Sequence, residues 1–137
     1  QKVNLLGFLQ TQNGLQTELL EKAGNLSGGQ CQRLVIARAL LRSDSAVYIF
    51  DEAASNIDVE SEELIMNVIH ELAKTKTVLL ISHRLANVVQ SDQIYFLKNG
   101  TICERGTHAE LMEQNGAYRH LYDSQMVLEN YGKEGNA

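Results

Sequence analysis

The sequence predicts an α/β fold with a parallel-sheet core, flanking helices and a β-hairpin near the C-terminus. Two apolar runs, residues 46–50 and 77–81, are rich in β-forming residues and too short to be helices. Between them, residues 59–73 carry apolar side chains at helical spacing. A strand, a helix and a strand joined by short connections form a βαβ unit, whose two strands are parallel. We expect both strands to be buried on both faces, as is typical of parallel sheets.

The segment before this unit contains a second helix signal. Ser27 followed by Gln30 is typical of a capping box, in which each side chain bonds a free backbone N–H at the start of a helix. This pair predicts a helix over about residues 28–41. Residues 1–12 place apolar side chains on roughly one side and predict part of another helix, whereas residues 13–26, punctuated by Gly and Asn, predict a loop.

The segment after the βαβ unit predicts a hairpin and short helices. Asn99-Gly100 lies between two strand-like runs and is a strong hairpin signal. Thr107 and Glu110 repeat the capping-box pattern and predict a short helix. Further helices are expected near residues 85–90 and 118–125, before a polar, flexible tail at 129–137.

Composition excludes several classes of function. The 137 residues carry a net charge of −5, which provides no basic surface, so we expect no nucleic-acid partner. No apolar run approaches the roughly 20 residues that a membrane span requires, and the N-terminus lacks the pattern of a signal peptide. Any link to a membrane must therefore come through a partner or through sequence outside this chain. Because the chain starts at Gln1 in mid-pattern, we interpret it as a fragment.

Three ionisable side chains follow the two predicted strands. Asp51 and Glu52 come after the first strand and His83 after the second, and parallel α/β sheets bind ligands beyond the carboxyl ends of their strands. Asp51 is placed to hold a Mg²⁺ ion beside a phosphate chain. Glu52 is placed to polarise a water in line with the terminal phosphate, and a neutral His83 to hold that geometry by hydrogen bonding. Alone, each residue has a simpler structural explanation, but their occurrence together favours a functional site.

The stretch Leu26-Ser27-Gly28-Gly29-Gln30 opens the helix predicted at 28–41. Two adjacent glycines let a backbone come close to a ligand with no side chain in the way. The free N–H groups and the dipole of a helix N-terminus favour an anion such as a phosphate. By residue type alone, an ordinary helix cap is the simpler explanation.

Four motifs in order decide between these explanations: Leu26-Ser27-Gly28-Gly29-Gln30, Val47-Tyr48-Ile49-Phe50-Asp51-Glu52, Ser55-Asn56-Ile57-Asp58 and Ile81-Ser82-His83-Arg84. They resemble, in sequence and spacing, the signature, Walker B, D-loop and switch-histidine segments of ATP-binding cassettes, the ATPases that drive membrane transporters. Glu52 falls at the catalytic glutamate of that family. The resemblance covers nearly the whole chain and implies the C-terminal half of a P-loop NTPase-type cassette. Cys31 and Asn56-Ile57 depart from the usual family residues without removing a catalytic group.

The resemblance implies an ATPase that uses ATP and Mg²⁺ and works as a head-to-tail dimer of two nucleotide-binding domains. In that family each ATP lies between the phosphate-binding loop of one subunit and the signature of the other. The signature, Leu26–Gln30, would bind the partner's ATP, with Ser27 and Gly29 contacting the γ-phosphate, and Asp58 would communicate across the interface. The resemblance also implies a transmembrane domain, fused or separate, and a place at the cytoplasmic face of a membrane.

The loop that grips the ATP phosphates is not in this sequence, because no Gly-x-x-x-x-Gly-Lys-Ser/Thr pattern occurs. We therefore expect the N-terminal half of the cassette to be missing and the chain by itself to be inactive. Residues 1–42 would form the end of the helical subdomain, residues 43–128 the C-terminal part of the ATPase core, and residues 129–137 the flexible tail.

Other segments indicate the kind of cassette. Residues 17–22 and 99–118 are similar to exporter cassettes, and Ala53 stands where importers commonly have Pro. Two alternatives remain open: a soluble cassette protein of translation or DNA repair, and a regulatory remnant that binds partners without hydrolysis. The acidic, compact C-terminus argues against the first, and the presence of Glu52 and His83 argues against the second.

Overall fold

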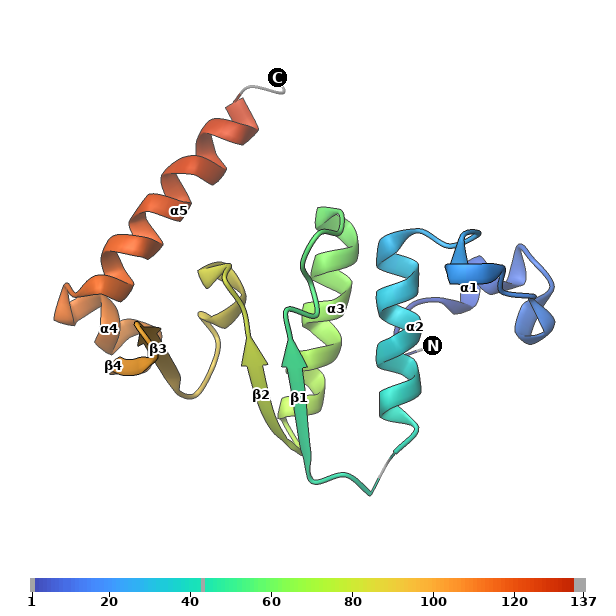
Figure 1. The fold of residues 1–137 in the computed structure, drawn as a ribbon, viewed down its shortest axis with the longest axis horizontal. Coiled ribbons are helices and arrows are strands. Elements are labelled where there is room, and N and C mark those ends of the chain that lie inside the picture. Colours follow the sequence, from blue (N-terminus) through green and yellow to red (C-terminus); the bar gives the residue numbers. More distant parts are fainter. Residues whose placement is uncertain (1, 43, 135–137) are drawn as a thin grey trace. The chain divides into compact units, whose positions relative to one another are not determined.

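The computed structural model describes residues 2–42 and 44–134, the last five of them through their backbone alone. The chain divides into two compact units, residues 1–81 and 82–137, which are described in turn (Figure 1). Within the described residues, no helix combines the length and apolar character needed to cross a membrane. The expected boundary between a helical subdomain and the ATPase core at residues 42 and 43 stays a prediction.

The first unit contains the predicted βαβ arrangement. Strands β1 (Val47–Asp51) and β2 (Thr77–Ile81) pair in parallel, with Ile49 opposite Leu79 and Asp51 opposite Ile81. Helix α3 (Val59–Ala73) connects them, and Ser27 opens helix α2 (Gly28–Leu40) with the predicted capping box. The elements of this unit are α1 (Leu6–Gln10), two 3-10 turns (Gly14–Gln16 and Glu21–Ala23), α2 (Gly28–Leu40), β1 (Val47–Asp51), α3 (Val59–Ala73) and β2 (Thr77–Ile81).

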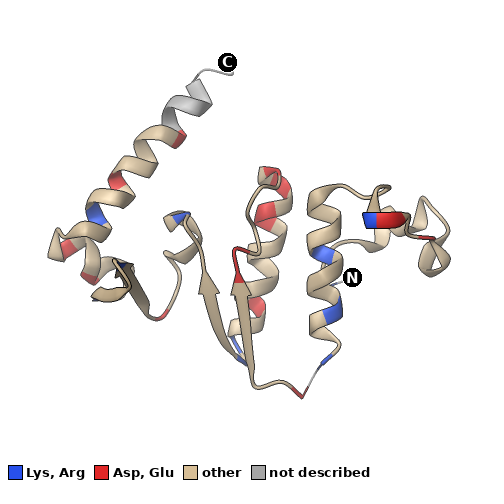
Figure 2. Cartoon of the chain, in the orientation of Figure 1, with Lys and Arg blue, Asp and Glu red and all other residues tan. Residues whose placement is uncertain are grey.

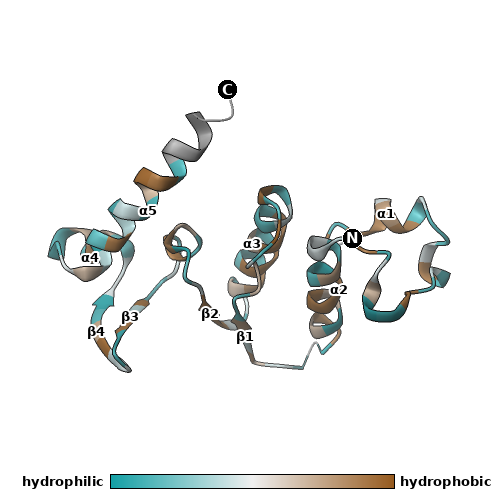
Figure 3. Cartoon of the chain, turned by 45° about the horizontal axis from the view of Figure 1, so that its top comes forward, coloured by the Kyte–Doolittle hydropathy of each residue, from teal (hydrophilic) through white to brown (hydrophobic). Residues whose placement is uncertain are grey.

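The core of this unit lies on one face of the two-stranded sheet. Phe50 from β1 packs in a cluster with Ile36 from α2 and with Ile65 and Ile69 from α3. Figure 3 shows hydrophobic segments, in brown, along both α2 and α3, which are in contact with each other. Each helix therefore buries an apolar stripe against the other elements of the unit.

The opposite face of the sheet is exposed, so the prediction that both strands are buried on both faces is wrong. Every second side chain of β1 and β2 is exposed: Val47, Ile49, Leu79 and Ile81 retain between 45% and 65% of their accessible surface. The reason is geometric, because successive side chains of a strand point to opposite faces and the helices of this unit cover only one of them.

The second unit is built around a hairpin and two helices. Strands β3 and β4 pair antiparallel, and Asn99 and Gly100 both have positive φ, 52° and 77°, as the predicted tight hairpin turn requires. Thr107 and Glu110 form the predicted capping box of α4. The elements are a 3-10 turn (Leu85–Val88), β3 (Ile94–Lys98), β4 (Thr101–Gly106), α4 (His108–Gln114) and α5 (Ala117–Glu134).

Helix α5 is anchored at its first turn. The Tyr118 side chain is fully buried, and its hydroxyl lies 2.8 Å from Nδ1 of His108. The carboxylate of Glu104 on β4 accepts hydrogen bonds from the free N–H groups of Ala117 and Tyr118, at 2.6 and 3.1 Å, and so caps the helix. The helix continues to Glu134, and the flexibility expected of the tail at 129–137 stays a prediction; residues 135–137 lie outside the described part of the chain.

Candidate functional site

The start of α2 carries the first candidate residues. Ser27 is the N-cap, and its Oγ accepts a hydrogen bond from the Gln30 N–H at 3.2 Å. Gln30 Oε1 in turn accepts from the Ser27 N–H at 2.9 Å. Leu26, just before the cap, is half-buried, whereas Ser27 and Gly28 are exposed. The capping box therefore fixes the backbone at the point where the sequence predicts phosphate contacts.

The two glycines of this turn have different surroundings. A Cβ atom at Gly29 would lie 2.1 Å from the Ser61 Oγ and 2.4 Å from the Ser61 Cβ, which is far inside contact distance. A Cβ at Gly28 would meet nothing closer than an Ile57 methyl group at 3.8 Å. Helix packing against α3 thus requires a glycine at position 29, whereas position 28 has room for a Cβ in ordinary contact with Ile57.

Asp58 lies at this same junction as the N-cap of α3. Its Oδ1 accepts a hydrogen bond from the Ser61 N–H at 2.8 Å. Hydrogen bonds from the Ser61 backbone and side chain hold the pKa of Asp58 below its ordinary value of 3.8, and the charge of Arg33 on α2 acts in the same direction. Figure 2 shows basic residues in blue on α2 and acidic residues in red on α3. The Asp58 carboxylate is thus held ionised beside the first turn of α2.

Asp51 and Glu52 stand where β1 ends. Asp51 is the last residue of the strand and its side chain is exposed. The Glu52 N–H donates to the Ile81 carbonyl at 2.9 Å, so the pairing with β2 extends one residue beyond the strand. Glu52 then adopts a φ of +48°, a left-handed conformation that non-glycine residues rarely take, and the chain turns there.

The exposed position of Asp51 fits the magnesium ligand that the sequence predicts. In the described residues, no three His, Cys, Asp or Glu side chains come together as a metal-binding cluster. Mg²⁺ in phosphate-binding sites commonly takes only one or two carboxylates, together with waters and phosphate oxygens. A single exposed carboxylate at the carboxyl end of a parallel strand is therefore suited to supply one ligand.

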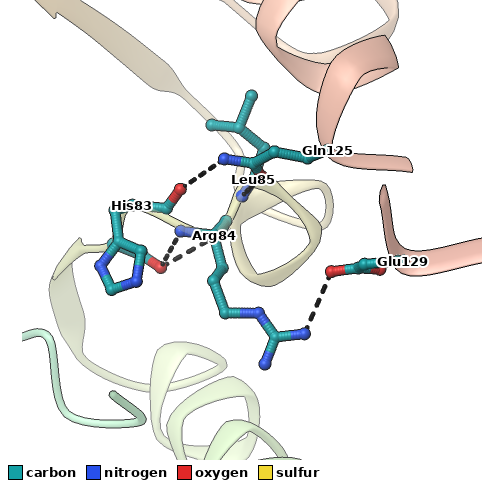
Figure 4. A network of polar contacts seen from close by, with 6 residues as sticks. His83, Arg84, Leu85, Gln125 and Glu129 are labelled. Atoms are coloured by element: carbon teal, nitrogen blue, oxygen red, sulfur yellow. Dashed lines mark hydrogen bonds and ion pairs between the residues drawn. The ribbon is translucent and has the colours of Figure 1, made fainter. Parts of the chain in front are cut away.

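His83 is the second residue of the second unit, two residues after the end of β2. Its side chain is exposed, and its backbone carbonyl accepts a hydrogen bond from Gln125 Nε2 at 2.7 Å (Figure 4). The structure thus brings together Gly29 and Asp58 at one junction and Asp51 and Glu52 at the end of β1, while His83 belongs to the other unit.

Sequence reasoning missed three of these contacts. Ser61 is buried against Gly29, yet a serine in the first turn of a helix carries no signal that distinguishes it from an exposed one. The cap formed by Asp58 did have a signal, because an aspartate directly before a helix is a favoured N-cap. The link between Gln125 and the segment after His83 joins residues 40 or more positions apart, and no local pattern predicts it.

Comparisons with known proteins agree with this geometry. The family model described as "ABC transporter" matches residues 3–55. An uncharacterised ABC transporter ATP-binding protein of Haemophilus influenzae is 50% identical over all of this chain, and an ATP-dependent lipid A-core flippase of Mannheimia succiniciproducens is 53% identical over 83% of it. This chain spans only 24% and 19% of the length of those relatives.

A solved structure of a bacterial Atm1-family ABC exporter with ATP bound is similar in fold. The TM-score is 0.80 at 32% sequence identity, over 90% of this chain and 22% of that one. The order of the four motifs, the βαβ arrangement and the matches to transporter relatives all lead to one assignment. The chain belongs to the ABC transporter family, as part of an exporter-type ATP-binding domain.

Proposed function

We propose that this chain supplies the signature, Walker B, D-loop and switch-histidine elements of an ATPase that couples ATP hydrolysis to export across a membrane. The observation that carries the proposal is the exposed Asp51-Glu52 pair directly after a strand of a parallel sheet, because ligands of such sheets bind at this edge. The exporter relatives favour this function over a soluble cassette of translation or DNA repair.

The chemical roles divide among these residues. Glu52 acts as the general base that polarises the attacking water, and His83 orients the γ-phosphate. Asp51 supplies a ligand to Mg²⁺, which neutralises charge on the phosphates. The Ser27 hydroxyl and the backbone at Gly28 and Gly29 present hydrogen-bond donors at a helix N-terminus, a position that favours phosphate.

We propose that three further protein segments complete this site and its coupling to transport. The phosphate-binding loop of a second nucleotide-binding domain would face the signature turn, in a head-to-tail dimer on the cytoplasmic side of a membrane. A transmembrane domain, fused or separate, would select the transported molecule. The rest of the ATP-binding domain would cover the exposed sheet face of Val47 and Ile49. The isolated 137-residue chain should then show no ATPase activity in a phosphate-release assay, and measurable turnover would contradict this expectation.

The test of the proposal is Glu52→Gln in the full-length protein. Loss of the general base should lower ATP hydrolysis by roughly 10²-fold or more, while the amide keeps the shape of the site. Binding of ATP, measured with a fluorescent nucleotide, should be retained. Glu63→Gln is the matched control, because Glu63 is an exposed carboxylate in the middle of α3. Near-normal turnover of Glu52→Gln would exclude Glu52 as the base, and near-normal turnover of His83→Ala would exclude the role of His83.

A further inference from the structure

Helix α5 reaches the backbone beside His83 through one side chain. The Gln125 amide bridges two backbone groups: its Nε2 donates to the His83 carbonyl at 2.7 Å, and its Oε1 accepts from the Leu85 N–H at 2.9 Å (Figure 4). A carbonyl only accepts and an N–H only donates, so one orientation of the amide satisfies both. Gln125 therefore stabilises one conformation of this segment, since moving the backbone at His83 or Leu85 would break a hydrogen bond.

A second side chain completes the support of the segment. The Ser82 Oγ accepts from the Arg84 N–H at 3.0 Å and donates to the Arg84 carbonyl at 3.1 Å. From the His83 carbonyl to the Leu85 N–H, each of four successive backbone polar groups thus has a side-chain partner. Residues 82–84 belong to no helix or strand, so side chains, not secondary structure, determine the path of the backbone here.

One turn further along α5, Glu129 forms a salt bridge with Arg84 at 3.1 Å. Both side chains are about one-third exposed, 34% and 37%, so solvent weakens this contact. Gln125 constrains the backbone more directly than this salt bridge does, because it bonds two backbone groups of the segment at once.

The direction of Gln125 is set by the anchored start of α5. Tyr118, Tyr122, Gln125 and Glu129 are spaced by four, three and four residues, which places them on one face of the helix. Tyr118 is fully buried at the first turn and Tyr122 stacks on it, with ring centroids 6.3 Å apart. One face of α5 therefore packs with its tyrosines near the start of the helix. Further along, the same face bonds residues 83–85 through Gln125 and Glu129.

We propose that Gln125 is a positioning residue for His83 in ATP hydrolysis. By fixing the His83 carbonyl and the Leu85 N–H, the amide limits the orientations from which the His83 ring projects, and catalytic geometry is sensitive to small displacements. This inference rests on the proposed function, because it assumes that His83 acts on the phosphate. It adds that helix α5, which carries none of the family motifs, is part of the support of that residue.

The experiment uses the full-length protein with Gln125→Ala, which keeps helix propensity and removes both bonds. The kcat of ATP hydrolysis should fall by about 10-fold with little change in KM, since displacement of a catalytic group impairs the chemical step. Gln125→Met, which keeps the length of the side chain, should behave alike and guards against a packing defect. Ser124→Ala is the matched control, because Ser124 is the exposed neighbour whose hydroxyl donates to the His120 carbonyl of its own helix.

Hydrogen–deuterium exchange tests the contact independently of activity. Gln125→Ala should speed exchange in the peptide covering residues 82–88, where the Leu85 amide loses its acceptor, and Ser124→Ala should not. Unchanged exchange in Gln125→Ala would overturn the proposal. Faster exchange together with a kcat equal to that of Ser124→Ala would overturn it too.

A double mutant separates this proposal from the one on which it rests. In a His83→Ala background, Gln125→Ala should cause no further loss of the residual turnover, because it acts through His83. An equal fold-loss in both backgrounds would show that Gln125 acts elsewhere and overturn its positioning role. Normal turnover of His83→Ala alone would instead defeat the proposed function of His83, whatever the exchange data show.

Discussion

Gly28 and Gly29 are adjacent in sequence but meet different surroundings. Gly29 is buried against Ser61, where an added Cβ would lie 2.1 and 2.4 Å from side-chain atoms. Gly28 is exposed, and a Cβ there would make only an ordinary contact with an Ile57 methyl group at 3.8 Å. The two glycines therefore serve different purposes. Gly29 allows α2 to pack closely on α3, and Gly28 leaves the helix N-terminus accessible.

Gly29→Ala should lower the free energy of unfolding of the domain by about 1–3 kcal/mol, the usual cost of overpacking. Ser61→Gly removes both clashing atoms, so the double variant Gly29→Ala with Ser61→Gly should recover most of that loss. Gly28→Ala is the control and should change little, because its Cβ would make only an ordinary contact, 3.8 Å from an Ile57 methyl group. Thermal unfolding of the four proteins measures these differences, and an equal effect of the two alanines would contradict the packing argument.

Asn56 illustrates how a residue that departs from its family can fit its own backbone. Its φ is +57°, in the left-handed region. Asn is one of the residues that adopt this conformation most readily, because its short side chain can hydrogen-bond locally. The replacement of the usual family residue at this position is thus compatible with the turn that leads into α3.

Two helices depend on caps whose carboxylates titrate in acid. Asp58 caps α3 and Glu110 closes the capping box of α4, and hydrogen bonds lower the pKa of each below its ordinary value, 3.8 for Asp58 and 4.5 for Glu110. Because the folded pKa is depressed, each carboxylate stabilises the fold above its ordinary value. That contribution is lost as the pH falls through the folded pKa.

Asp58→Asn should therefore change stability little near neutral pH, because asparagine is an equally good N-cap. Below pH 3.8 the variant should lose stability less steeply than the unaltered protein, since it has no carboxylate to protonate there. Denaturant midpoints measured across the acid range test this slope. Glu110→Gln should produce the same flattening starting from pH 4.5, and identical slopes in all three proteins would show that the caps do not control acid stability.

At the scale of the whole molecule, the first unit carries an apolar sheet face that its own described residues leave exposed. Ile49 and Leu79 are paired neighbours at the centre of that face, 65% and 49% exposed. A two-stranded sheet is rarely stable alone, and contiguous exposed apolar surface marks a contact with other protein. We therefore expect the isolated chain to self-associate through this face.

Replacing Ile49 and Leu79 together by Thr should shift the isolated chain toward the monomer, because threonine keeps β-propensity but removes apolar surface. Sedimentation velocity measures the shift. Leu15→Thr serves as the control, since Leu15 is 90% exposed but lies outside the sheet. If the control reduced association as much as the double variant, the sheet face would not be the contact.

The proposed head-to-tail dimer predicts which subunit each signature serves. Gly28→Asp is the suitable lesion, because a carboxylate there repels phosphate without clashing and favours the helix dipole. In a mixed dimer with Gly28→Asp in one subunit and a broken phosphate-binding lysine in the other, both lesions fall in one site. The other site stays intact and should retain ATP hydrolysis well above that of a dimer with Gly28→Asp in both subunits.

Gly28→Asn in place of aspartate gives the neutral comparison for this mixed dimer, since it adds similar bulk without charge. If each subunit used its own signature, the mixed dimer would carry one lesion in each site. Its activity would then fall to that of the doubly substituted dimer, and the assignment across the interface would be wrong.

The sequence by itself determined the elements whose causes are local. The capping boxes at Ser27 and Thr107, the Asn99-Gly100 turn and the βαβ pattern are written in residues a few positions apart, and the structure confirms them. The order of the motifs likewise identifies the family from the sequence alone.

Only the tertiary structure decided which side of each element is covered. The continuous apolar runs of β1 and β2 predict strands buried on both faces, but how many faces are covered depends on how many helices pack on the sheet. Likewise, the fit of Gly29 against Ser61 and the bridge from Gln125 to His83 and Leu85 join segments 32 to 42 residues apart. Such contacts arise from the packing of whole elements, and for that reason no local pattern of residues predicts them.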